Sequence, residues 1–249
     1  MKSILNNQAV DKLIFALDAS NYEEALCWIE LLSGHVGMFK VGKELFTSVG
    51  PKIVESIKQR GQRVFLDLKF HDIPNTVARA GEAAVNLGVD MFNIHASGGF
   101  KMIHDTVKAV QLHAQKKGRQ KPVVLAVTVL TSLNDADLAE IGFKKNTKEQ
   151  VLHLAALAKS AGASGVVASA QDIAALRADL GDEFVIVTPG IRSSSEKIAD
   201  DQKRTLSASE AVKLGANYIV VGRPISQSKD PLAACQQIVR EIAEGISLR

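Results

Sequence analysis

Residues 63–97 read RVFLDLKFHDIPNTVARAGEAAVNLGVDMFNIHAS, and this stretch predicts a strand, a helix and a second strand. The first and last runs, Arg63–Phe70 and Met91–Ser97, are short and mostly apolar, as is typical of strands buried on both faces. Between them Asn75–Leu87 predicts a helix, and Gly88 follows at the position where helices favour glycine. A strand, a crossover helix and a further strand form the unit from which parallel sheets are built.

The same alternation runs along the whole chain. The strand candidates are Lys12–Asp18, Met38–Gly42, Arg63–Phe70, Met91–Ser97, Val123–Leu130, Gly165–Ser169, Phe184–Gly190 and Tyr218–Arg223. The helix candidates are Asn21–Ser33, Pro51–Arg60, Asn75–Leu87, Lys101–Lys117, Thr147–Ser160, Gln171–Leu180, Ser207–Leu214 and Pro231–Glu244. Because about 250 residues is the usual length of a (β/α)8 barrel, we expect an α/β protein with a TIM barrel as a single domain over residues 1–249. A doubly wound open sheet is the alternative.

Composition narrows the class of protein. The chain is 46% hydrophobic and 23% charged, as is usual for globular proteins. Its net charge is only +3, so we expect no nucleic-acid partner. The apolar run Leu13–Leu17 is too short for a signal peptide, and no stretch of about 18 apolar residues predicts a membrane span. Cys27 and Cys235 lie far apart in the sequence and are interpreted as reduced thiols of a cytoplasmic protein.

Polar residues gather at the carboxyl ends of the predicted strands, where barrels of this type carry their active sites. They are Asp18, Lys40, Asp67, Lys69, Asp72, His95, Thr131, Ser132, Arg192, Gly222 and Arg223. Lysine and aspartate are rarely buried unless they are paired. We therefore expect the charged members of this set to satisfy one another.

Asp67 and Lys69 lie two residues apart on one predicted strand, so both side chains should point to the same face. An Asp-x-Lys pair at an exposed sheet edge would have the same spacing. The preceding run Val64-Phe65-Leu66 favours the buried alternative, because it is typical of a buried strand.

The chain resembles the orotidine 5′-phosphate decarboxylase family, and its bacterial branch most of all. The central match is Asp67-Leu68-Lys69-Phe70-His71-Asp72-Ile73-Pro74-Asn75-Thr76, which contains the Asp-x-Lys-x-x-Asp core of the family. Further matches follow in order along almost the whole chain, at residues 16–18, 40–44, 93–99, 127–132, 188–192, 201–204 and 221–225. Together these motifs are far more specific than any one of them.

The resemblance implies an enzyme that converts orotidine 5′-monophosphate to uridine 5′-monophosphate, the last step of de novo pyrimidine nucleotide synthesis. It implies no metal and no cofactor. Lys69 is the implied proton donor to carbon 6 of the pyrimidine, within an alternating-charge network of Lys40, Asp67, Lys69 and Asp72. It also implies a homodimer with shared sites, in which Asp72 and Thr76 come from the partner subunit.

The resemblance further implies a set of substrate-binding residues. They are Asp18, Lys40, Asp67, Thr76, Thr131, Arg192, Gln202, Gly222 and Arg223. Asp18 is expected to bind ribose hydroxyls, and either Thr131 or Ser132 to contact the pyrimidine, with Thr131 preferred. Arg192 and Gln202 follow the seventh predicted strand, and Gly222 and Arg223 end the eighth. Barrels often bind phosphate at this position, beside a short extra helix. Residues Ile225–Ser228 are the candidate for that helix.

Two alternative functions share parts of this pattern. Magnesium-dependent sugar-phosphate decarboxylases and aldolases of the same superfamily share the Asp-x-Lys-x-x-Asp motif, but carry a metal-binding glutamate at the position resembling Lys40. A lysine there opposes a metal site, since a cation repels a cation. A non-catalytic phosphate-binding barrel is the second alternative, because a fold does not determine a function. The buried charges oppose it, since they are costly without a task.

Overall fold

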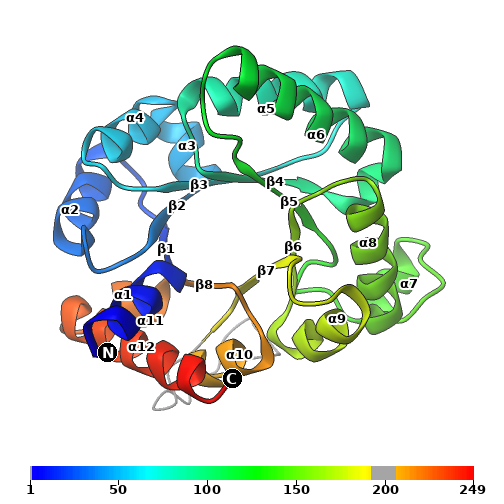
Figure 1. Ribbon diagram of the computed structural model, residues 1–249. Coiled ribbons are helices and arrows are strands. Elements are labelled where there is room, and N and C mark those ends of the chain that lie inside the picture. Colours follow the sequence, from blue (N-terminus) through cyan, green and yellow to red (C-terminus); the bar gives the residue numbers. More distant parts are fainter. Residues whose placement is uncertain (1, 192–205) are drawn as a thin grey trace.

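The computed structural model describes residues 2–191 and 206–249 (Figure 1). Eight parallel strands form a closed barrel in which neighbours follow chain order and β8 pairs with β1. The strands are β1 (Leu13–Leu17), β2 (Met38–Gly42), β3 (Val64–Phe70), β4 (Met91–His95), β5 (Val123–Val127), β6 (Gly165–Val167), β7 (Val185–Pro189) and β8 (Tyr218–Val221). The predicted single-domain (β/α)8 barrel is confirmed, and the open sheet is not found.

Helices surround the barrel on its outside (Figure 1). Each predicted crossover helix is present close to its predicted bounds: α2 (Tyr22–Leu32), α4 (Lys52–Gln59), α5 (Pro74–Leu87), α6 (Gly99–Lys116), α8 (Thr147–Ser160), α9 (Ile173–Leu180), α10 (Ala208–Leu214) and α12 (Pro231–Ser247). Their ends follow the sequence signals. Asn21 caps α2 by accepting from the Glu24 N–H at 2.9 Å, and Gly88 ends α5 in the left-handed region.

Several further short elements were not predicted. They are α1 (Lys2–Lys12), α3 (Lys43–Val49), η1 (Ala96–Gly98), α7 (Asp135–Glu140) and η2 (Ala170–Asp172). Between the predicted strand Val123–Leu130 and the predicted helix Thr147–Ser160 lies α7, which begins with a capping box between Asn134 and Asp137. The short helix expected at Ile225–Ser228 is α11, and it begins earlier, at Arg223 (Arg223–Ser226). Its start precedes Pro224, a residue that favours the first turn of a helix.

The hydrophobic core has two shells, one on each side of the barrel wall. Inside the barrel, alternate strand residues such as Ile14, Met38 and Met91 form a closed apolar layer. The intervening residues, among them Phe39 and Phe92, point outward and pack with the helices in a larger cluster. The inner layer fills the barrel, so a ligand can bind only at one of its ends.

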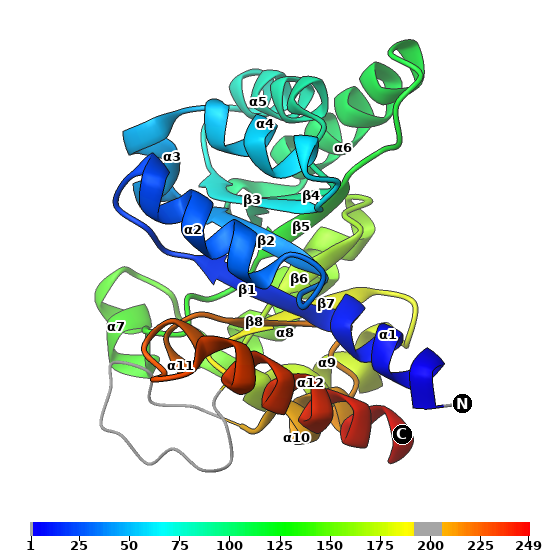
Figure 2. The ribbon, with the colours of Figure 1, turned by 90° about the vertical axis from the view of Figure 1, so that its left-hand side faces the viewer.

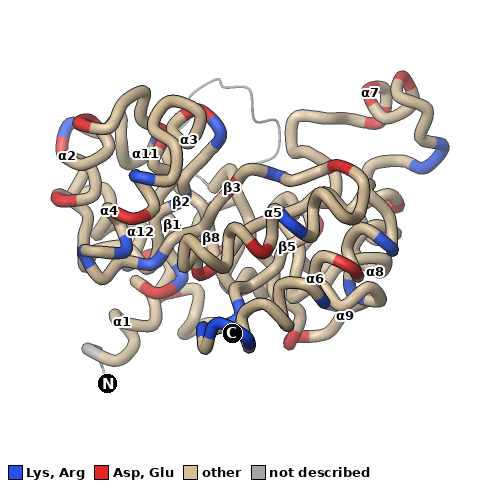
Figure 3. Tube along the Cα trace, turned by 90° about the horizontal axis from the view of Figure 1, so that it is seen from above, with Lys and Arg blue, Asp and Glu red and all other residues tan. Residues whose placement is uncertain are grey.

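The carboxyl ends of the strands all open on one face, which lies at the left in Figure 2 together with α7 and α11. Both chain ends lie toward the opposite face. In the described ranges, acidic and basic residues are interspersed around the outside of the barrel (Figure 3). No helix in the described part of the chain is long and apolar enough to cross a membrane.

Candidate active site

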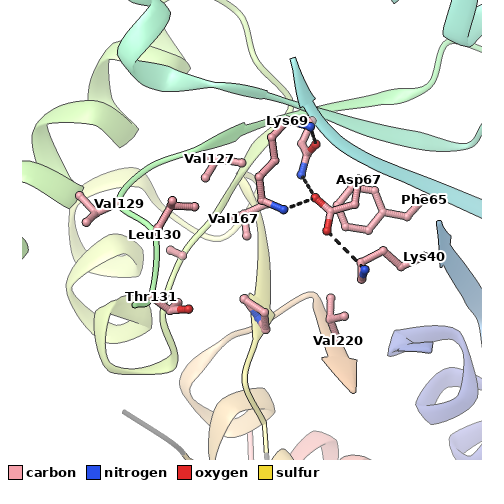
Figure 4. A pocket seen from close by; sticks show the side chains of 13 residues that line it. Lys40, Phe65, Asp67, Lys69, Val127, Val129, Leu130, Thr131, Val167 and Val220 are labelled. Carbon is pink, nitrogen blue, oxygen red and sulfur yellow. Dashed lines mark hydrogen bonds and ion pairs between the residues drawn. The ribbon is translucent and has the colours of Figure 1, made fainter. Parts of the chain in front are cut away.

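A row of charged side chains crosses the barrel mouth from β1 to β3. Strand pairing places Lys40 beside Ala16 and Gly42 beside Asp67, so that Lys40 and Asp67 point inward one layer above the apolar filling. Lys40 Nζ lies 3.4 Å from Asp18 Oδ1 and 3.5 Å from Asp67 Oδ2. Lys69 Nζ lies 2.6 Å from Asp67 Oδ1 (Figure 4). The charges therefore alternate in the order Asp18, Lys40, Asp67, Lys69.

Burial differs along this row. The side chains of Lys40 and Asp67 are each 12% exposed and that of Lys69 is 24% exposed, whereas Asp18 at the rim is 63% exposed. Removing charges from water is costly, and only close pairing with further hydrogen bonds offsets the cost. The inner members of the row are paired in this way, which fixes an ammonium group at the edge of the pocket.

Lys69 occupies an unusual backbone conformation. Its φ is +52°, and no other non-glycine residue in the described ranges has a positive φ. The pairing of β3 with β4 shifts register between Leu66 and Phe70, so regular alternation does not extend to Lys69. The side chains of Asp67 and Lys69 nevertheless meet, as their spacing predicted. A left-handed residue other than glycine costs about 1–2 kcal/mol, and such strain is concentrated at functional sites.

Asn93 is a member of the site that sequence analysis did not single out. It lies on β4 and is only 1% exposed. Its Nδ2 donates to Asp67 Oδ1 at 2.7 Å, and its Oδ1 accepts from the Lys69 N–H at 2.8 Å. The available signal was a polar residue inside an apolar strand, at the alternate position to Met91. Asn93 lies in the middle of its strand, so it is not among the strand-end residues from which the site was predicted.

The pocket beside this row is mainly apolar. Phe65 and the polar residues Lys40, Asp67, Lys69 and Asn93 line one side, and the rest of the lining comes from Val127, Val129, Leu130, Thr131, Val167, Ala168, Pro189 and Val220. Its volume is about 180 Å³. Of the two candidates for the pyrimidine contact, Thr131 lines the pocket, whereas Ser132 is exposed and does not. A charged rim over an apolar pocket strengthens electrostatic interactions with a bound molecule.

Two predicted site residues lie away from the pocket of their own chain. Asp72 and Thr76 are exposed at the start of α5 and do not line it. Asp72 Oδ1 accepts from the Ile73 N–H at 2.6 Å. A single chain therefore brings together Asp18, Lys40, Asp67 and Lys69, but not Asp72.

The predicted phosphate residues are described only in part. Arg192 and Gln202 lie outside the described residues. Gly222 joins β8 to α11, and a Cβ atom there would lie 3.2 Å from Ala16 Cβ and 3.4 Å from Asp18 Oδ2. Arg223, the next residue, is exposed at the start of α11. The loop after β8 therefore lies beside Asp18, at the edge of the charged row.

A histidine pair lies next to the row. The rings of His71 and His95 have centroids 5.3 Å apart. Burial, which is the largest cause, and the nearby His71, Lys43 and Lys69 together lower the pKa of His95 to about 4, against an opposing effect of Asp67. His95 is therefore neutral at neutral pH. Its surroundings carry positive charge, which favours an anionic ligand.

Comparison with known proteins gives a consistent result. A family model described as "Orotidine 5'-phosphate decarboxylase / HUMPS family" matches residues 11–238. An orotidine 5′-phosphate decarboxylase of Syntrophus aciditrophicus is 56% identical over 249 residues, covering 100% of this chain and 99% of the relative. One of Geotalea daltonii is 50% identical, covering 96% of this chain and 99% of the relative.

The fold comparison agrees with the sequence comparison. The crystal structure of orotidine 5′-phosphate decarboxylase from Lactobacillus acidophilus superimposes with a TM-score of 0.82 at 38% identity, covering 92% of this chain and 98% of that one. Because the family model and these relatives match nearly the whole chain, the chain belongs to the orotidine 5′-phosphate decarboxylase / HUMPS family.

Proposed function

We propose that this enzyme decarboxylates orotidine 5′-monophosphate to uridine 5′-monophosphate in pyrimidine nucleotide synthesis, as the names of its relatives indicate. The observation that carries the proposal is the Lys69 ammonium group. It is held 2.6 Å from Asp67 at the edge of an apolar pocket. An ammonium at this point can stabilise negative charge on a bound ring and then deliver a proton to it.

Lys69 acts as the proton donor. The bond between carbon 6 and the carboxylate breaks, carbon dioxide leaves, and the electron pair stays on carbon 6. The Lys69 Nζ proton is then transferred to carbon 6, and solvent restores the ammonium form. At an effective dielectric constant near 20, one charge at 4 Å stabilises the developing anion by about 4 kcal/mol. Very slow uncatalysed reactions need about 20 kcal/mol or more, so other contacts must contribute.

Lys40 and Asp67 complete the charged surroundings of carbon 6. Asp67 Oδ2 lies 3.5 Å from Lys40 and Asp67 Oδ1 lies 2.6 Å from Lys69, so this carboxylate holds both ammonium groups. Lys40 also reaches Asp18, whose exposed position suits a contact with the ribose hydroxyls. Thr131, at the pocket wall, is assigned to the pyrimidine.

The phosphate of the substrate is assigned to the loops after β7 and β8. A pocket of about 180 Å³ is smaller than the roughly 300–1,000 Å³ of sites that enclose whole small ligands. It suits the reacting ring, and the phosphate then lies toward Gly222 and Arg223. Arg192 and Gln202 are assigned to the same phosphate by resemblance alone. Binding energy from this remote group can be used to organise the reacting centre.

The position of Lys40 distinguishes this proposal from the magnesium-dependent members of the superfamily. Its ammonium lies between the carboxylates of Asp18 and Asp67, which are the groups that would otherwise attract a divalent cation. In the described ranges, no three His, Cys, Asp or Glu side chains are grouped so that they could hold a metal. A reaction without metal or cofactor is proposed from the family resemblance.

We propose that the active enzyme is a homodimer with shared sites. Asp72 and Thr76 are exposed and do not line the pocket of their own chain, and two apolar residues at the starts of α5 and α6, Ile73 and Phe100, are 67% and 48% exposed. A two-fold partner covering this face would remove them from water and bring its own Asp72 to the site.

The free cysteines Cys27 and Cys235 suit a reducing compartment such as the cytoplasm.

The test is a spectrophotometric assay with orotidine 5′-monophosphate in excess chelator. We expect full turnover with and without chelator. Absence of turnover would overturn the proposal, and loss of activity on chelation would favour the magnesium-dependent alternative.

The shared site has its own test, in which Lys69→Ala and Asp72→Asn homodimers exchange subunits. In a mixed dimer one site carries both lesions and the other carries none. Random exchange makes about half of the dimers mixed, so activity should return to about a quarter of the wild-type value. Verified mixed dimers without regained activity would refute shared sites.

A further inference from the structure

Asn93 is a buried amide in contact with both partners of the Lys69–Asp67 ion pair. Burying an amide without hydrogen bonds costs several kcal/mol, and here both ends of the amide are used. Asn93 Nδ2 donates to Asp67 Oδ1 at 2.7 Å, and Asn93 Oδ1 accepts from the Lys69 N–H at 2.8 Å. Its strand neighbours Phe92 and Ile94 point outward into the apolar core between barrel and helices.

The amide of Asn93 matches the chemistry of both contacts. A backbone N–H can only donate and an ionised carboxylate can only accept, so the residue between them must carry one acceptor and one donor. Aspartate, with nearly the same shape, keeps the acceptor and loses the donor. Alanine loses both.

These contacts constrain both the main chain and the side chain of Lys69. At the main chain, Asn93 binds the N–H of a residue at φ +52°, where the register shift between β3 and β4 interrupts the regular ladder. At the side chain, Asn93 and the Lys69 ammonium donate to the same oxygen of Asp67, at 2.7 and 2.6 Å. Strained conformations persist only when their surroundings over-determine them, and Asn93 is one such constraint.

We propose that Asn93 is a positioning residue. It holds the Lys69 ammonium at the distance and angle from which Lys69 donates a proton to carbon 6. This inference rests on the proposed function of Lys69. Asn93 acts through Asp67 and the Lys69 main chain, while the assigned phosphate contacts lie across the mouth at β8. Its loss should therefore reduce kcat and leave KM nearly unchanged.

Asn93→Ala should reduce kcat by about 10- to 100-fold, because a misplacement of about 1 Å can cost about 100-fold in rate. KM should stay within about twofold. The matched control is Asn217→Ala. Asn217 also accepts, through Oδ1, from the backbone N–H of a neighbouring strand residue, Ile186, at 2.8 Å. Asn217 lies at the start of β8, far from the barrel mouth, so kcat should be unchanged even if stability falls.

Asn93→Asp adds a pH test that a purely structural role would not pass. Two carboxylates in hydrogen-bond contact cannot both stay ionised, so their shared pKa is raised. Protonation of the pair restores an O–H donor to Asp67. The kcat deficit of Asn93→Asp should therefore shrink as the pH falls from about 8 to about 5, while the deficit of Asn93→Ala stays flat.

The groups around residue 93 are Asp67 and Lys69 on β3, Lys40 on β2 and His95 on β4; β5 presents Leu125 and Val127. Dividing each variant rate by the wild-type rate at the same pH removes their own titration. Wild-type kcat for both Asn93 variants, or a pH-independent deficit in Asn93→Asp, would overturn the proposal. So would an equal fall in kcat for Asn217→Ala.

Failure of the proposed function itself is visible separately, since the wild type would then not turn over orotidine 5′-monophosphate. In that case the pKa of the Lys69 amine, followed by NMR after ¹³C-methylation, replaces the rate. Asn93→Ala removes the contacts without adding a charge, so a pKa that differs between wild type and Asn93→Ala supports the positioning role, and an unchanged pKa refutes it.

Discussion

Lys69 combines a chemical role with a strained backbone, and two substitutions separate these properties. Lys69→Ala and Lys69→Gly both remove the ammonium group that lies 2.6 Å from Asp67. Loss of one charge about 4 Å from the developing anion costs about 4 kcal/mol, or about 10³-fold in rate. Loss of general acid catalysis removes a further factor of about 10² to 10⁴. We expect both variants to retain less than about 10⁻⁵ of wild-type kcat.

The two variants should differ in stability. Alanine at φ +52° keeps the left-handed penalty of about 1–2 kcal/mol, whereas glycine does not pay it. Glycine gives back part of this gain because it loses more backbone entropy on folding, about 0.5–1 kcal/mol. Lys69→Gly should therefore be more stable than Lys69→Ala by about 0.5–1 kcal/mol. In both variants Asp67 keeps its contacts with Lys40 and Asn93, so both should fold.

The assay pairs two measurements on each variant. Urea denaturation gives the free energy of unfolding, and binding of uridine 5′-monophosphate by calorimetry shows that the pocket is intact. Turnover of more than a few per cent by either folded variant would refute the role of Lys69 as proton donor. A Lys69→Gly protein less stable than Lys69→Ala would refute the strain argument and leave the chemical argument standing.

The remaining predictions concern phosphate binding, pH and packing. Arg223→Ala should lose about 2–5 kcal/mol of transition-state stabilisation, and added guanidinium should restore part of it. The measurement is kcat/KM with the phosphorylated substrate and with the unphosphorylated nucleoside. An equal fall in kcat/KM for both would contradict phosphate binding by Arg223. The pKa of His95 is lowered to about 4, mainly by burial, so the unfolded chain takes up this proton first as the pH falls. The free energy of unfolding should therefore decline from about pH 6.5 to pH 4, and less steeply in His95→Gln; identical slopes would argue against it. Gly165→Ala would place a Cβ atom against the Val185 carbonyl oxygen. The free energy of unfolding, measured by urea denaturation, should therefore fall by about 1–3 kcal/mol or more. An unchanged denaturation midpoint would contradict this close approach.

The barrel could be predicted because each strand carries its own signal. Short apolar runs separated by helix patterns and glycine caps specify the alternation locally, so all eight strands were found near their observed bounds. The helices α1 and α7 were missed for different reasons. In α1 the apolar residues form no stripe, and it is held by packing on α12. In α7 the capping box of Asn134 and Asp137 is present in the sequence, but no helix was predicted from it.

The candidate site was predicted only in part. The sequence predicts what local strand geometry determines, and it does not predict what depends on the pairing between strands. Side-chain direction along one strand depends on local geometry, which is why Lys40, Asp67 and Lys69 could be placed at one end of the barrel. The left-handed conformation of Lys69 depends on how β3 pairs with β4. That register is a tertiary property, so the sequence could not show that Asn93 accepts from the Lys69 N–H.

Asp72 marks the point at which one chain no longer specifies the site. It lies three residues beyond Lys69 in the motif, yet it is exposed and hydrogen-bonds to the neighbouring Ile73 N–H instead of joining Lys40, Asp67 and Lys69. In the proposed dimer, this motif would supply residues to two different sites, one through the strand and one through the turn that follows it. β3 carries Asp67 and Lys69 to the pocket, with Lys69 in the left-handed conformation and not in regular alternation. Asp72, in the turn before Pro74, is exposed. With the partner's Asp72 facing Lys69, as proposed, the charged row would contain five groups, three of them carboxylates.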